Sequence, residues 1–111
     1  MIRDFENTRL VVIGGGEHAT VVIDAAICQG RKVLGFLDKQ NNEKLTDAFD
    51  ILYLGNDSKL IELKKDKSLD FVFGIGSNSI RKEIYEKFDL ASIRWATILH
   101  PSAVISSTAN I

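Results

Sequence analysis

The chain has 111 residues, of which 45% are hydrophobic, so it is long enough to form one domain with a real core. Its 14 basic and 15 acidic side chains give a net charge of -1, which removes the electrostatic reason for binding nucleic acid or an anionic membrane. Cys28 is the single cysteine, so no internal disulfide can form. No apolar run approaches the about 18 residues of a membrane span, and the N-terminus has no signal-peptide core. Together these features predict a cytoplasmic domain.

Residues 10–24, LVVIGGGEHATVVID, organise the chain. The apolar run at 10–13 stops at three glycines, which is typical of a buried parallel strand. Residues 18–30 carry apolar side chains that suit a helix packed against a sheet, and the segment ends at Gly30, a plausible C′ residue. Strand, glycine turn and helix predict the phosphate-binding corner of a Rossmann-like unit.

Further strands are predicted along the rest of the chain. Apolar runs indicate strands at 32–37 and 69–75, a short strand or extended connector at 51–54, and a last strand at 93–99.

The segments between these runs predict helices and one loop. A short helix around 60–63 is capped by Asn56 or Asp57, and a charged helix covers 79–88. Residues 39–46 are polar and rich in turn formers, which predicts an exposed loop. The alternation of strand and helix predicts an α/β fold with an open, mainly parallel sheet and helices on both faces.

Right-handed crossovers place the carboxyl ends of all parallel strands on one edge of the sheet. The loops at 14–17, after Asp38 and at 76–78 share that edge, where open α/β sheets bind their ligands.

The end of the chain has a period of six residues, because Ala103 recurs as Ala109 and Ile105 as Ile111. This period predicts the start of a left-handed parallel β-helix, a solenoid that needs several coils for stability. We therefore expect a Rossmann-like domain at 1–101 and the first residues of a truncated hexapeptide-repeat domain at 102–111. A partial coil leaves its apolar side chains poorly covered, so we expect a frayed tail or a crystal contact there.

The glycine turn matches the pattern G-x-G-x-x-[GA] through Gly14, Gly16 and Ala19. Asp38, at the end of the second strand, can accept a hydrogen bond from a ribose hydroxyl. The other interpretation is a tight turn with a solvated aspartate. Glu17 suits the helix dipole but repels a phosphate placed beside it, so it points away or the phosphates lie nearer Gly76.

Two further groups carry alternatives. His18 next to Glu17 is either an acid/base pair or, as we favour, a first-turn histidine that bonds backbone or ligand. The second glycine turn offers backbone N–H groups, a hydroxyl, an amide and a guanidinium for a pyrophosphate or sugar, through Gly76, Ser77, Asn78 and Arg81. Its other interpretation is ordinary helix capping with an exposed arginine.

Four segments in order, GGGEHATVVIDA, GFLD, GIGSNSIRKEIYEK and ILHPSAVIS, resemble the N-terminal domain of PglD/NeuD-like bacterial nucleotide-sugar acyltransferases. The resemblance covers essentially the whole chain. It implies an N-terminal domain that binds a UDP-sugar, followed by a β-helix that binds acetyl-CoA and forms a homotrimer. It places around the nucleotide sugar Gly14, Gly16, Glu17, His18, Asp38, Gly76, Ser77, Asn78 and Arg81.

The implied function is UDP-sugar binding within an acetyl-CoA-dependent sugar N- or O-acetyltransferase of bacterial surface-glycan biosynthesis. The catalytic histidine would lie in the β-helix beyond Ile111, and His100 belongs to the interdomain HPSA junction. We therefore expect no catalytic residue, metal or bound cofactor in this chain, and no turnover by it alone. Two alternatives stay open: an NAD-binding domain of an oxidoreductase, which leaves the six-residue period unexplained, and a non-catalytic regulatory module that binds a ligand.

Overall fold

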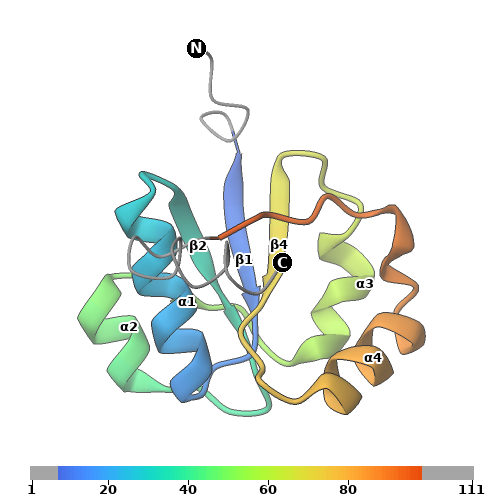
Figure 1. The fold of residues 1–111 in the computed structure, drawn as a ribbon, viewed down its shortest axis with the longest axis horizontal. Coiled ribbons are helices and arrows are strands. Elements are labelled where there is room, and N and C mark those ends of the chain that lie inside the picture. Colours follow the sequence, from blue (N-terminus) through green and yellow to red (C-terminus); the bar gives the residue numbers. More distant parts are fainter. Residues whose placement is uncertain (1–7, 99–111) are drawn as a thin grey trace, which may run out of the picture.

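In the computed structural model, which describes residues 8–98, four parallel strands form a sheet in the order β3-β2-β1-β4 (Figure 1). The strands are β1 (Arg9–Ile13), β2 (Lys32–Leu37), β3 (Leu52–Tyr53) and β4 (Leu69–Phe73). β1 pairs with β2 on one side and with β4 on the other. The chain moves outward through β2 and β3 and then returns to add β4 beside β1, so the direction of winding reverses between β1 and β4.

Helices cover both faces of this sheet (Figure 1). They are α1 (Glu17–Cys28), α2 (Glu43–Phe49), α3 (Leu60–Leu63) and α4 (Asn78–Lys87), with short 3-10 turns η2 (Asp57–Lys59) and η3 (Leu90–Ser92). Among the described residues, no helix is both long enough and apolar enough to cross a membrane.

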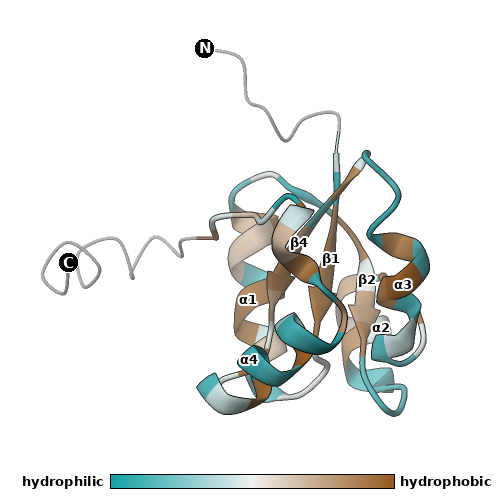
Figure 2. Cartoon of the chain, turned by 90° about the vertical axis from the view of Figure 1, so that its right-hand side faces the viewer, coloured by the Kyte–Doolittle hydropathy of each residue, from teal (hydrophilic) through white to brown (hydrophobic). Residues whose placement is uncertain are grey.

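The two faces have separate apolar cores because side chains alternate along a strand. From β1, Leu10 and Val12 pack with α1 and α2, whereas Val11 and Ile13 pack with α3 on the opposite face. All four of these β1 side chains are buried. Figure 2 shows the apolar strands enclosed by helices, with the hydrophilic residues on the outer surface.

The predicted α/β architecture is confirmed, including the parallel sheet and the helices on both faces. Gly30 is the C′ residue of α1, with a φ of 85°, and its N–H donates to the carbonyl of Ile27. Asn56 caps η2 through Ser58 N–H, which leads directly into α3 as expected.

The predicted loop at 39–46 is wrong over its second half, because α2 begins at Glu43. Asn42 supplies the N-cap, since its side-chain oxygen accepts a hydrogen bond from Lys44 N–H. Leu45 and Phe49 lie four residues apart and pack against the core on the α1 face. Tertiary packing thus makes a helix of a segment whose local composition favours a turn.

The predicted last strand at 93–99 is also wrong as a strand. Among residues 93–98, only Trp95 forms a bridge, in parallel orientation, with Phe71 of β4. Phe71 N–H donates to the carbonyl of Arg94, and Ala96 N–H donates to the carbonyl of Phe71. The segment therefore lies along the edge of β4 but pairs with it at one position.

The predicted β-helix start at 102–111 and the expected frayed tail lie outside the described residues, so the boundary at 101 stays a prediction.

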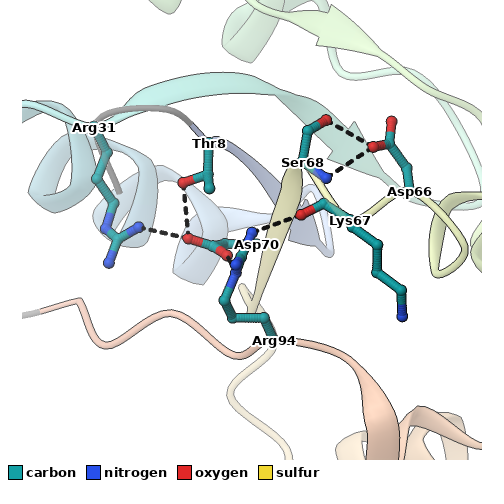
Figure 3. Close-up of polar contacts among 7 residues, drawn as sticks. All are labelled: Thr8, Arg31, Asp66, Lys67, Ser68, Asp70 and Arg94. Atoms are coloured by element: carbon teal, nitrogen blue, oxygen red, sulfur yellow. Dashed lines mark hydrogen bonds and ion pairs between the residues drawn. The ribbon is translucent and has the colours of Figure 1, made fainter. Parts of the chain in front are cut away.

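A buried carboxylate fixes the end of the sheet opposite the glycine turn (Figure 3). Asp70, near the start of β4, is 4% exposed and accepts a hydrogen bond from Thr8 Oγ1 at 2.9 Å. Arg31, which follows α1, pairs with the same carboxylate oxygen at 3.2 Å. Arg94 pairs with the other oxygen and donates to the carbonyl of Lys67. One carboxylate therefore joins the start of β1, the end of α1 and the segment after α4.

We expect Asp70→Asn to destabilise the fold by about 3 kcal/mol, because it leaves the largely buried Arg31 guanidinium beside a neutral amide. Urea unfolding followed by Trp95 fluorescence measures this loss. Asp66→Asn is the matched control: its exposed carboxylate accepts hydrogen bonds from Ser68, whose hydroxyl and N–H lower the pKa of Asp66. Equal midpoints for the two variants would contradict the structural role of Asp70.

Candidate functional site

The turns after β1 and β4 touch one another at two glycines. A Cβ on Gly14 would lie 2.7 Å from the carbonyl oxygen of Gly74, and Gly14 has a φ of 123°. A Cβ on Gly74 would lie 2.9 Å from Cα of Ala19 in α1. Gly74 N–H donates to the carbonyl of Ile13 at 2.8 Å. The third position of the glycine pattern, Ala19, thus packs α1 directly against the end of β4.

The N-terminus of α1 carries no side-chain cap. Its N-cap residue is Gly16, whereas Asn42 caps α2 and Ser77 caps α4 through side-chain oxygens. The first N–H groups of a helix have no acceptor within the helix, and the helix dipole makes them attractive to anions. A Cβ on Gly16 would meet no atom within 4 Å, so a ligand can approach the backbone closely here.

Asp38 follows β2 and is held by several contacts. Its N–H donates to the carbonyl of Gly55, and its carbonyl accepts a hydrogen bond from the Tyr53 hydroxyl. One carboxylate oxygen accepts from Lys39 N–H at 2.9 Å. The other lies against Gly15, where a Cβ would come within 2.9 Å of it. Backbone and side chain are therefore both fixed beside the glycine turn.

These features line one cleft of about 750 Å³, within the size range of small-molecule sites. It lies at the carboxyl edge of the sheet, where the winding reverses between β1 and β4. Its lining residues come from the ends of the strands, the turns that follow them and one face of α4, and they are Ile13–His18, Leu37–Lys39, Asp57, Gly74–Gly76, Ile80, Glu83, Ile84 and Lys87.

Charges of both signs face the cleft. The carboxylates are Glu17, Asp38, Asp57 and Glu83. The cations are Lys39, after β2, and Lys87, at the end of α4, and His18 adds an imidazole. Carboxylates suit hydroxyl and N–H donors of a ligand, whereas lysines and backbone N–H groups suit phosphate oxygens. The arrangement fits a ligand that has both a polyol or base and a phosphate.

Six of the nine predicted site residues line this cleft: Gly14, Gly16, Glu17, His18, Asp38 and Gly76. The structure brings together the two glycine turns and Asp38, as expected from the sheet topology. No hydrogen bond or ion pair joins Glu17 to His18 among the described residues, and the imidazole Nδ1 lies close to Gly76.

The other three, Ser77, Asn78 and Arg81, do not line the cleft. Ser77 Oγ accepts a hydrogen bond from Ile80 N–H, so it performs the helix capping that was the alternative interpretation. Asn78 is the exposed first residue of α4, and Arg81 is half-buried. Their role in ligand binding stays a prediction.

The sequence analysis missed one wall of the cleft. Ile80, Glu83, Ile84 and Lys87 lie on one face of α4, with the spacing of successive helical turns. α4 has no buried residue, and Ile80 is 46% exposed. The available signal was the i, i+3, i+4, i+7 spacing of these four residues, which places two isoleucines and two charged side chains on one helical face. Gly15 and Lys39 lie in the predicted ligand loops but were not among the nine predicted site residues, and Asp57 was not predicted to lie near the site.

No group of three or more potential metal ligands occurs among residues 8–98. Cys28 is exposed at the end of α1, outside the cleft.

Comparisons with known proteins agree with this fold. Residues 9–88 match the PglD N-terminal domain family. The chain belongs to this family. It is similar to the UDP-N-acetylbacillosamine N-acetyltransferase of Bacillus subtilis (strain 168), with 26% identity over 104 residues, covering 92% of this chain and 47% of the relative.

Two solved structures resemble the fold. The acetyltransferase domain of PglB from Neisseria gonorrhoeae FA1090, in complex with acetyl coenzyme A, has a TM-score of 0.68 and 26% identity over 86% of this chain and 45% of that one. A mutant of perosamine N-acetyltransferase from Caulobacter crescentus, in complex with CoA and GDP-perosamine, has a TM-score of 0.67 and 26% identity over 84% and 43%. This PglD N-terminal domain therefore spans less than half the length of these relatives.

We expect Gly14→Ala to destabilise the PglD N-terminal domain by about 2 kcal/mol or more, because it adds a methyl group at positive φ against the carbonyl of Gly74. Gly16→Ala, with open space around its Cβ, costs less than about 1 kcal/mol. Thermal unfolding followed by circular dichroism measures both. A Gly16→Ala protein that is the less stable of the two would contradict the assigned contact.

Proposed function

We propose that this chain is the nucleotide-sugar-binding domain of a sugar N-acetyltransferase. The observation that carries the proposal is the cleft between the β1–α1 and β4–α4 turns, where the uncapped N-terminus of α1 and the fixed carboxylate of Asp38 face one space. Family membership and the acetyltransferase relatives support it. They favour it over an NAD-dependent oxidoreductase, to which none of these relatives belongs.

In this proposal the ligand has two contact regions. Asp38 accepts hydrogen bonds from ribose or base, since its carboxylate is held at the end of β2. The diphosphate lies near the backbone N–H groups of the glycine turn, with Lys39 and Lys87 contributing positive charge. Glu17 is exposed, so its carboxylate can turn away from the phosphates.

We propose UDP as the nucleotide. The Bacillus subtilis relative, which aligns with 92% of this chain, is named for a UDP-linked sugar. The Caulobacter crescentus enzyme was solved with GDP-perosamine, which makes GDP the competing ligand. Both share the nucleoside diphosphate for which the cleft offers N–H groups and lysines.

Acetyl transfer itself is assigned to a part of the protein beyond residue 98. In the reaction the sugar amine attacks the thioester carbonyl, the carbon–sulfur bond breaks and CoA leaves as its thiol, so a base is needed that takes the proton from the amine. His18 is the imidazole of the cleft, and no hydrogen bond to a described residue orients it. We therefore propose that a hexapeptide-repeat β-helix binds acetyl-CoA, supplies the base and forms a homotrimer, while this domain holds the nucleotide sugar.

We expect calorimetric titration of the chain to detect saturable binding of UDP or a UDP-sugar, weaker binding of GDP and none of NAD. Asp38→Ala should weaken UDP binding by about tenfold or more, the value of a lost hydrogen bond to a charged group. Asp47→Ala removes an exposed carboxylate of α2 outside the cleft and is the control. Binding of NAD in preference to UDP would contradict the proposal.

A second titration tests where the phosphates lie. Lys87→Ala should weaken UDP binding by about threefold to tenfold and reduce the dependence of affinity on salt, because it removes a cation from the cleft. Lys82→Ala, an exposed lysine of α4 outside the cleft, is the matched control. Arg81→Ala tests the earlier prediction directly: a larger loss than in Lys87→Ala would place the phosphates at the β4–α4 turn instead.

A further inference from the structure

Asn42 connects α2 to the glycine turn through both ends of its side-chain amide. Its oxygen accepts a hydrogen bond from Lys44 N–H at 3.1 Å, which caps α2. Its nitrogen donates to the carbonyl of Gly15 at 2.8 Å. The amide accepts at its oxygen and donates at its nitrogen, whereas an ionised aspartate can only accept.

The core holds Asn42 in place. Its carbonyl accepts the N–H groups of Leu45 and Thr46, the first bonds of α2. Leu45 is 2% exposed and packs against the core beneath α1 and β2. Asn42 is half-buried, and the packing of α2 on the core holds it in place. Its amide nitrogen is therefore a fixed donor to the Gly15 carbonyl.

This contact sets the orientation of one peptide group at the cleft. All described peptide bonds are trans, so the carbonyl of Gly15 and the N–H of Gly16 point in opposite directions. Since Asn42 draws the carbonyl toward α2, the Gly16 N–H is directed away from α2. That N–H finds no acceptor among residues 8–98. Glycine on both sides would otherwise let this peptide rotate at low cost.

We propose that Asn42 is a positioning residue for the nucleotide-sugar site: by holding the Gly15 carbonyl, it aims the Gly16 N–H at the diphosphate. The proposal rests on the proposed function, because it assigns a fixed donor to the phosphates of that ligand. Asn42 itself does not line the cleft, so it acts through Gly15. The glycine turn is thus oriented from the second crossover, which is distant in sequence from the turn.

The test separates the hydrogen bond from Asn42 to the Gly15 carbonyl, called the clamp below, from the capping of α2 by the same side chain. Asn42→Ser and Asn42→Asp both keep a good N-cap for α2 but lose the hydrogen bond to Gly15. An ionised aspartate has no donor, and the serine hydroxyl oxygen lies one bond closer to the backbone than the amide nitrogen, so it caps α2 without reaching the Gly15 carbonyl. UDP and uridine, with GDP and guanosine in parallel, are titrated into wild type and variants. Because only the diphosphates reach the Gly16 N–H, both variants should weaken UDP by about tenfold and leave uridine affinity within about twofold.

Asn56 provides the matched control. It caps η2 through Ser58 N–H in the same way, lies next to the cleft residue Asp57, and forms no hydrogen bond with the described residues of the glycine turn. Asn56→Ser and Asn56→Asp should leave the ratio of UDP to uridine affinity unchanged.

In amide NMR spectra, the Gly16 resonance should shift strongly when UDP binds wild type and much less in Asn42→Ser.

The outcomes are distinct. Asn42→Ser binding UDP as tightly as wild type overturns the clamp, as does an equal loss of UDP and uridine. Weakening in Asn42→Asp alone assigns the effect to its added charge and also overturns the clamp. A wild-type protein that binds uridine as tightly as UDP also overturns the clamp, because the diphosphate then contributes no affinity. If wild type binds none of the four compounds, the proposed function itself fails.

Discussion

The close approach of the turns after β1 and β4 is the constraint on which the site depends. Gly14 and Gly74 leave no room for a side chain between β1, β4 and the start of α1. That contact brings the N-terminus of α1 to the edge of the sheet, at the point where the winding reverses. The helices that follow the two strands, α1 and α4, pack on opposite faces of the sheet, and the cleft is lined by residues of both beside this contact.

A second fixed point stands at the other end of the same strands. Asp70 gathers Thr8, Arg31 and Arg94 around one buried carboxylate, away from the cleft (Figure 3). Between the two ends, β1 is buried on both faces, and its pairing with β2 shifts in register between Leu10 and Val11. The polar cluster therefore supports the fold, and the glycine contact leaves the ligand edge open.

Much of this arrangement could be predicted from the sequence, because its signals are local. The β-branched run before Gly14 and the helical pattern after it predict the first strand, turn and helix. The alternation of strands with helices along the chain predicts the parallel sheet. α2 escaped prediction because Asn42 and Leu45 acquire their roles through distant partners, the Gly15 carbonyl and the core. The segment at Trp95 resembles a strand by composition, yet it contacts β4 at a single position.

The wall formed by α4 shows a different limit. Apolar spacing identifies the side of a helix that faces the protein, but it does not separate a face packed on the sheet from one that lines a cleft. Ile84 packs toward the core below, whereas Ile80 on the same side is exposed to the cleft. Ile80 lies in the first turn of α4, next to the loop at the edge of the sheet, whereas Ile84 lies one helical turn further along. Which part of a helix packs on the sheet is set by tertiary packing, so the ligand wall becomes visible only in the folded chain.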